Sequence, residues 1–230
     1  MSQTKYYMAF AASDKLDNSA KDLLERRAQG TKESYVPALE QTMEYFIPEM
    51  MDAFLVGTVD AVGLSKMSTK VVHSTADVLS KTARMIVPHL LKKRSNQELD
   101  PMVDFVDEVR IPEETTVKNK PYSGCEIDKP THDKIQHVIS EIRAGNGEQV
   151  RGELNEIMSL TVDILLEGLM KRAINQVKQG FVVRKITDGA IATCRAAGHG
   201  VVNKVFKKLE ENQLIHLANY FDELVITAQR

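Results

Sequence analysis

The stretch LLKKRSNQELDPMVDFVDEVRI, residues 90–111, aligns without a gap with VFKKLEENQLIHLANYFDELVI, residues 205–226. Six of the 22 pairs are identical, namely Lys92, Lys93, Leu99, Asp107, Glu108 and Ile111 with the residues 115 positions later. The same offset places Gly30 on Gly145 and Leu39 on Leu154. Because the 230 residues are twice this offset, we predict a tandem duplication of one unit.

A chance match is the alternative, since two amphipathic helices align at some shift. An offset of 103 does pair Thr58-Val59-Asp60 with Thr161-Val162-Asp163. At the offset of 103 the predicted helix ends do not align. The offset of 115 aligns the glycines that end helices, the Lys pairs and the Asp-Glu pairs together.

Apolar residues recur at intervals of three and four along each half, which is typical of amphipathic helices. The predicted helices are, in the first half, about 19–30, 39–62, 68–94 and a last one after Asp100-Pro101, and in the second half about 131–145, 154–177, 183–209 and a last one after Asn212. Strand signals are nearly absent. We therefore predict an all-α fold of two four-helix units, packed about a pseudo-twofold axis like a covalent homodimer.

The predicted organisation is an N-terminal helical repeat, 1–111, a linker, 112–130, and a C-terminal helical repeat, 131–230. The linker is polar and contains three Pro. Residues 1–17 include Tyr6, Tyr7, Met8 and Phe10 and are too apolar for a solvated tail. We expect them to dock on the body, with a short first helix as the alternative.

Composition excludes several classes of protein. With 43% hydrophobic and 27% charged residues the chain is neither disordered nor a disulfide scaffold. Its formal net charge of −2 lacks the basic field of a dedicated nucleic-acid binder. The two Cys fit a reducing compartment, and no apolar run reaches the length of a membrane span. These features predict a cytoplasmic protein without a membrane partner.

Catalytic and metal-binding motifs are sparse. None of the six His has a His 115 positions away, so we expect no symmetric metal site and no cofactor. His132-Asp133 resembles the dipeptide of the HD phosphohydrolases, although an Asp in a first helical turn also complements the helix dipole. A metal-dependent hydrolase using this pair is the enzyme alternative. Cys125 is expected to be exposed in the linker, and Cys194 to be buried on an apolar helix face.

Two basic pairs, Lys92-Lys93 and Lys207-Lys208, occupy matching positions. At helix ends they complement the negative terminus of the helix dipole. In a pseudo-twofold body they also resemble the two contact points of a dimeric nucleic-acid-binding regulator, which is a further alternative.

The candidate ligand-binding residues are those at which the matched helices differ most in chemistry. In this stretch each half also contains proline or glycine, which weakens a helix. The four candidates are Arg84, His89, His199 and Asn203. We expect them to line a polar-edged groove near the pseudo-twofold axis, and ordinary surface replacement is the competing interpretation. The predicted function is non-enzymatic binding or scaffolding, through a partner protein first and a small ligand in this groove second. The expected state is a monomer with pseudo-dimeric halves or a weak homodimer.

Overall fold

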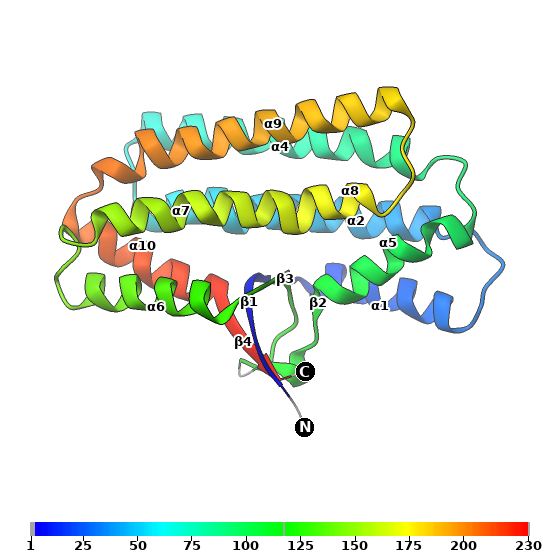
Figure 1. Ribbon diagram of the computed structural model, residues 1–230, viewed down its shortest axis with the longest axis horizontal. Helices are drawn as coiled ribbons and strands as arrows, with labels where there is room; N and C mark the ends of the chain where they lie inside the picture. Colours follow the sequence, from blue (N-terminus) through cyan, green and yellow to red (C-terminus); the bar gives the residue numbers. More distant parts are fainter. Residues whose placement is uncertain (1–2, 117, 230) are drawn as a thin grey trace.

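The computed structural model describes residues 3–116 and 118–229, and most of them are helical, as predicted (Figure 1). The helices of the first half are α1 (Asp14–Ala28), α2 (Val36–Met51), the π-helix η1 (Asp52–Val56), α3 (Gly57–Val62), α4 (Lys66–Leu91) and α5 (Asn96–Val109). Those of the second half are α6 (Lys129–Arg143), α7 (Arg151–Leu165), the π-helix η3 (Leu166–Lys171), α8 (Arg172–Asn175), α9 (Phe181–Lys204) and α10 (Glu211–Leu224). Short 3₁₀ turns, η2 (Glu113–Thr115) and η4 (Phe206–Lys208), complete the helical elements.

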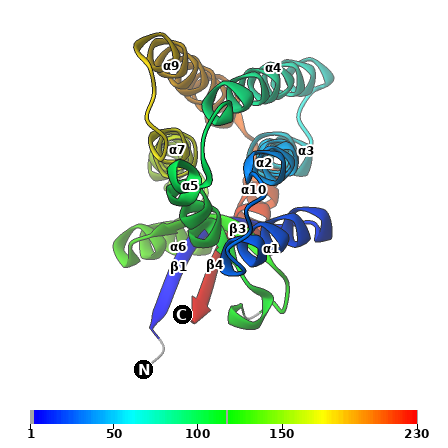
Figure 2. The same ribbon diagram turned by 90° about the vertical axis from the view of Figure 1, so that its right-hand side faces the viewer.

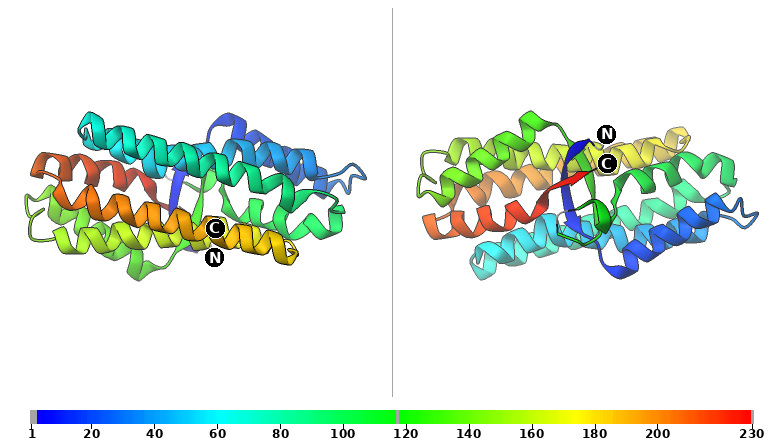
Figure 3. Two further views of the ribbon diagram at one scale, coloured as in Figure 1. Left: turned by 90° about the horizontal axis from the view of Figure 1, so that it is seen from above. Right: turned by 90° about the horizontal axis from the view of Figure 1, so that it is seen from below.

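The helices lie in layers (Figure 2). The antiparallel pair α4 and α9 forms the outermost layer, above a second layer built from α2, η1 and α3 and from α7, η3 and α8. Helices α1 and α5 lie at one end of the molecule and α6 and α10 at the other, with the strands between them (Figure 3). No helix in the part of the chain that the structure describes is long and apolar enough to cross a membrane.

The expectation of an all-α fold is wrong in one respect, because a curled four-stranded antiparallel sheet lies at the centre. Its strands β1 (Thr4–Ala11), β2 (Arg110–Ile111), β3 (Tyr122–Ile127) and β4 (Val225–Gln229) are ordered β2-β3-β1-β4. Residues 7–10 of β1 are buried on both faces of the sheet, so the sequence lacks the alternation that marks a half-buried strand. The segment 112–130, expected as a linker, contains β3.

The strand register relates positions 115 apart. Ala9 of β1 pairs with Gly124 of β3. Two further pairs follow the same offset. Met8 of β1 lies opposite Val225 of β4, and Ser123, which is 115 positions after Met8, lies opposite Arg110 of β2, which is 115 positions before Val225. The helix bounds recur with nearly the same offset, for example Asp14–Ala28 against Lys129–Arg143.

Two glycines mark helix ends as predicted, and several helices start earlier than predicted. Gly30 and Gly145 lie just beyond α1 and α6 with positive φ, which confirms them as stop residues. The starts are earlier than predicted: Ser13 caps α1, and Ser95 caps α5 in a capping box with Glu98. Pro101, expected near the start of the last helix of the first half, therefore lies inside α5.

The core is continuous between the sheet and the helices. On one face of β1, Met8 and Phe10 belong to the main apolar cluster of the helices. On the other face, Tyr7 and Ala9 pack with Ile111, Tyr122, Ile226 and Ala228 in a smaller cluster. The N-terminal segment therefore docks on the body, as expected, but as a strand.

We predict that Gly124→Ala destabilises the protein, because a Cβ at this position would overlap the Met8 carbonyl oxygen and lie 2.5 Å from Ala9 Cα. Overpacking of this kind costs roughly 1–3 kcal/mol in the free energy of unfolding. Gly152→Ala is the control, since nothing lies within 4 Å of a Cβ there and Ala favours the helix. Urea unfolding measures both, and equal stabilities would contradict the tight β1–β3 approach.

Candidate functional site

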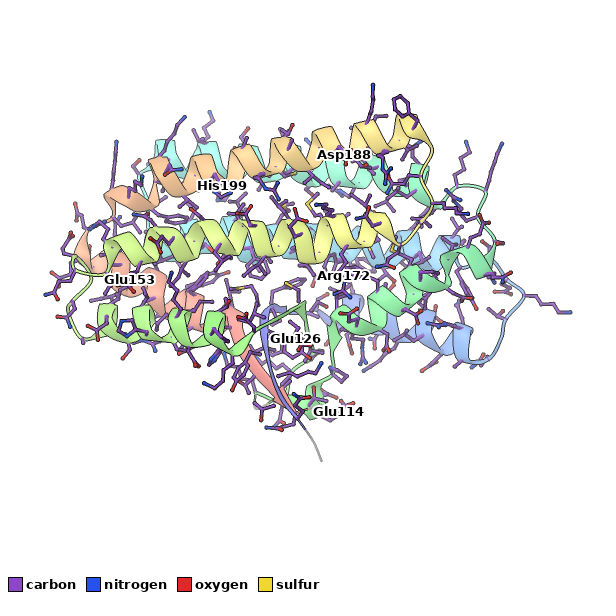
Figure 4. The ribbon with its side chains drawn as sticks, viewed as in Figure 1. Glu114, Glu126, Glu153, Arg172, Asp188 and His199 are labelled. Carbon is purple, nitrogen blue, oxygen red and sulfur yellow. The ribbon has the colours of Figure 1, made fainter. Side chains whose placement is uncertain are left out.

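The structure places the four predicted site residues in two different surroundings. Arg84 is exposed on α4 and lines a cleft beside η1, and His89 is exposed in the last turn of α4. His199 of α9 lies 3.3 Å from Asp163 of α7, measured from Nε2 to Oδ1 (Figure 4). The side chain of Asn203 donates a 3.0 Å hydrogen bond to the His199 carbonyl oxygen. Arg84 and His199 thus line different parts of the surface.

The cleft that contains Arg84 has a volume of about 1060 Å³. It opens between α4, η1, the end of β1, the loop before β3 and α10. Its charged and phenolic lining residues are Glu49, Asp52, Asp77, Arg84, Lys118, Lys120, Tyr122, Tyr220 and Glu223. Charges of both signs therefore face one cleft.

Most of these charges are not engaged with each other. Among the residues that the structure describes, Asp52, Glu223, Arg84, Lys118 and Lys120 form no ion pair. A ligand that carries both an anionic and a cationic group would find partners here without displacing a pair.

Tyr220 forms the cleft wall beside η1. Its hydroxyl donates a 2.8 Å hydrogen bond to the Ala53 carbonyl oxygen, and Gly57 lets the ring approach because a Cβ there would overlap the hydroxyl. Burial raises the pKa of Tyr220 to about 12, and the nearby carboxylates of Asp52, Glu223 and Asp60 act in the same direction. The phenol is therefore a neutral donor at ordinary pH.

The matching positions of the second half hold ion pairs instead. Arg195, which stands 115 positions after Ser80, bonds to Asp163 at 2.9 Å and to Glu167 at 2.7 Å. Asp163 stands at the position matching Pro48. The first half thus has a small residue and a proline where the second half has a cation and its anion.

A second candidate site is the outer surface of α4 and α9. These two helices contain eight Lys and Arg (Lys66, Lys70, Lys81, Arg84, Arg184, Lys185, Arg195 and Lys204) and two acidic residues (Asp77 and Asp188, the latter labelled in Figure 4). The rest of the chain contains 22 Lys and Arg and 30 Asp and Glu. The outer helix layer is therefore basic on an otherwise acidic molecule.

Exposed apolar side chains accompany this charge. Val71, Val78 and Met85 are 58%, 57% and 66% exposed and follow one face of α4 at intervals of seven residues. On α9 the exposed positions Gly189, Ala192, Thr193 and Ala196 are small. We call the exposed residues of α4 and α9 from Lys70 to Met85 and from Lys185 to Lys204 the α4–α9 face. It combines unpaired cations with a row of apolar side chains.

The sequence prediction missed this face because the charge was counted over the whole chain. The signal was present, since the excess of cations is visible once the two long helices are counted separately. The exposure of Val71 and Val78 could not be predicted, because apolar residues at helical spacing are usually buried.

The residues of the enzyme alternative, His132 and Asp133, lie near the start of α6. The His132 ring stacks on Tyr6 with centroids 4.2 Å apart, and Asp133 pairs with Lys129 at 2.5 Å. Within residues 3–116 and 118–229, no three His, Cys, Asp or Glu side chains could hold a metal ion together. Cys125 is buried, contrary to expectation, and burial raises its pKa to about 12, whereas Cys194 is buried as predicted.

We predict that Tyr220→Phe lowers the free energy of unfolding by roughly 0.5–1.5 kcal/mol, because the Ala53 carbonyl loses its donor. Since the folded pKa lies above the ordinary value of 10.0, the contribution is complete below about pH 10 and declines toward pH 12. Urea unfolding at several pH values measures this. The control is Tyr45→Phe. The wild-type Tyr45 hydroxyl has only a long 3.5 Å contact with Gln41, so its removal should change the free energy of unfolding little.

Comparisons with protein-family models, with curated proteins and with solved structures give no match.

Proposed function

We propose that this chain is a non-enzymatic binding protein that docks an acidic partner protein on the α4–α9 face. The observation that carries the proposal is the coincidence of unpaired cations with an exposed apolar row on the outermost pair of helices. Charged groups around an apolar strip are the features by which an amphipathic helix is recognised in a groove.

The geometry of the face suits a helical segment. Small residues on α9, including Gly189 and Ala196, allow a partner backbone to approach closely. The neighbouring row on α4, Val71, Val78 and Met85, supplies apolar area for burial. The partner would place an apolar stripe on this row and acidic side chains toward the flanking lysines.

Charge argues against the other occupants. Two copies of the face would repel each other, because each carries the same excess of cations. A nucleic acid would pair with the lysines but would leave Val71, Val78 and Met85 against phosphates and sugars. An acidic amphipathic segment satisfies both the cations and the apolar row.

The proposal includes an architecture of two copies of one unit related by a pseudo-twofold axis. It is supported by the pairing of Ala9 with Gly124, its counterpart at the offset of 115, and by the nearly equal helix bounds. The buried thiols of Cys125 and Cys194 suit a reducing compartment, so the proposal places the protein in the cytoplasm.

The docking proposal predicts selective binding of an acidic helix. The probe is a synthetic peptide of three heptads with Leu at two positions of each heptad and Glu at most others, and its Lys counterpart is the charge-reversed probe. Fluorescence anisotropy should show binding of the Glu peptide alone. Lys70→Glu/Lys81→Glu should weaken it at least about tenfold, because two of the cations that flank the apolar row are reversed.

The control variant Lys15→Glu/Lys32→Glu makes the same change in net charge at exposed residues outside the face. Equal weakening by both variants would show that only total charge matters and would contradict the proposed face. Binding of the wild type to phosphatidylserine vesicles, with no binding of the Glu peptide, would replace the partner protein by a membrane surface.

The cleft supports a second candidate function, the binding of a small zwitterion. The free carboxylates Asp52 and Glu223 and the free cation Arg84 are the observation that favours it. Calorimetric titration with the dipeptide Ala-Ala should show saturable binding that Arg84→Ala removes and Lys32→Ala leaves unchanged. Absence of binding in the wild type, or its retention in Arg84→Ala, would eliminate this candidate.

A further inference from the structure

Two apolar cavities lie between the outer helix layer and the layer beneath it. The first has a volume of about 70 Å³ and is lined by residues of α2, α4, α5, η3 and α8. The second has a volume of about 90 Å³ and is lined by residues of α2, η1, α4, α7, η3 and α9. No charged side chain lines either cavity among the described residues.

The two cavities share a wall. Met50 of α2 and Met170 of η3 line both of them. Methionine side chains are unbranched and flexible, so the barrier between the cavities is a soft one. When these two side chains move aside, the cavities join into one elongated apolar channel between the layers.

The shape and lining define the ligand class. Dry apolar cavities bind apolar molecules, and an engineered cavity of ~150 Å³ accepts benzene. Each cavity here is smaller than that, so a rigid ring has too little room in either one alone. A linear alkyl chain is thin and flexible, and it can run through both cavities past Met50 and Met170.

The charge at one end of the channel indicates the head group. Leu90, Leu91 and Ile174 line the first cavity where α4 ends and α9 begins. The neighbouring segments 88–95 and 175–187 contain Lys92, Lys93, Arg94, Lys178, Arg184 and Lys185 and no Asp or Glu. Arg94 already pairs with Glu98 at 3.1 Å, so Lys92, Lys93 and Lys178, which form no ion pair among the described residues, are the cations that an anionic head group would meet at this end.

We propose that the channel binds a single-chain alkyl carboxylate, with the carboxylate at the basic end and the tail extending through the first cavity into the second. This site lies beneath the outer helix layer and shares only Lys185 with the α4–α9 face, and its test does not depend on the proposed function. Half-buried Ala83 and Val87 of α4, opposite Ala173 of α8, form the part of the wall through which a chain enters.

The test uses decanoate, octanoate and decyltrimethylammonium, each below its micelle concentration, in calorimetric and thermal-melt titrations of the full chain. Decanoate should bind and raise the melting temperature. Affinity should rise about fourfold for each added methylene while the tail still fills the channel. Equal binding of decyltrimethylammonium would overturn the carboxylate assignment, and no binding of decanoate would overturn the site.

A cavity-filling variant separates binding from folding. Ala83→Leu places a larger side chain in the first cavity, so decanoate affinity should fall at least about tenfold while the apo protein remains as stable or becomes more stable. Ala173→Leu, on the opposite wall, is the second variant if the first fails to fold. Ala144→Leu, at an exposed helix end, is the matched control and should bind as the wild type does. Full affinity in a folded Ala83→Leu protein would overturn the site.

Cys194 reports whether the tail reaches the second cavity, because it lines that cavity whereas Cys125 does not. Decanoate should slow the reaction of Cys194 with N-ethylmaleimide, measured by mass spectrometry of the labelled peptide, and leave the rate at Cys125 unchanged. An unchanged rate at Cys194 under saturating decanoate would overturn the proposed path of the tail.

Discussion

The antiparallel pairing of β1 with β3 is the constraint on which the rest of the structure depends. It joins residue 9 of one half to residue 124 of the other, and Gly124 is required because a side chain would overlap β1. Both faces of β1 are buried, so this single strand belongs to the core of the helices and to the smaller cluster beneath the sheet. The long helices α4 and α9 pack directly against each other in the outermost layer, on the side away from the sheet (Figure 1).

Within this shared frame the two halves differ where chemistry is concentrated. Arg195, Asp163 and Glu167 neutralise one another on the surface of the second half. The matching positions Ser80 and Pro48 of the first half carry no charge, so Asp52 has no such partner. An exposed ion pair contributes little to stability, so a polar cleft without one costs the fold little.

The helical character and the glycines that end helices could be predicted from the sequence, because apolar spacing and Gly30 and Gly145 are local signals. The strands could not, since Tyr7–Phe10 is an apolar run that fits a buried helix or a buried strand equally well. Arg84 was predicted from its contrast with its matched residue to share a groove with His89, His199 and Asn203, whereas the cleft that it lines contains none of these three residues. Its neighbours there come from η1, α10 and the loop before β3, and only the tertiary structure brings these segments together.

The charge distribution links the outer helix layer to both binding proposals. The excess of cations on α4 and α9 produces repulsion across adjacent antiparallel helices, because charges closer together than the Debye length of about 8 Å at physiological salt are only partly screened. This repulsion acts on the layer above the two apolar cavities. Ion pairs of Arg195 with Asp163 and Glu167 join α9 to the layer beneath it, and the apolar packing beside the cavities is incomplete. An acidic partner on the outside would neutralise the cations, and an alkyl chain on the inside would complete the packing. The two events stabilise the same pair of helices from opposite sides, and each therefore favours the other by thermodynamic linkage.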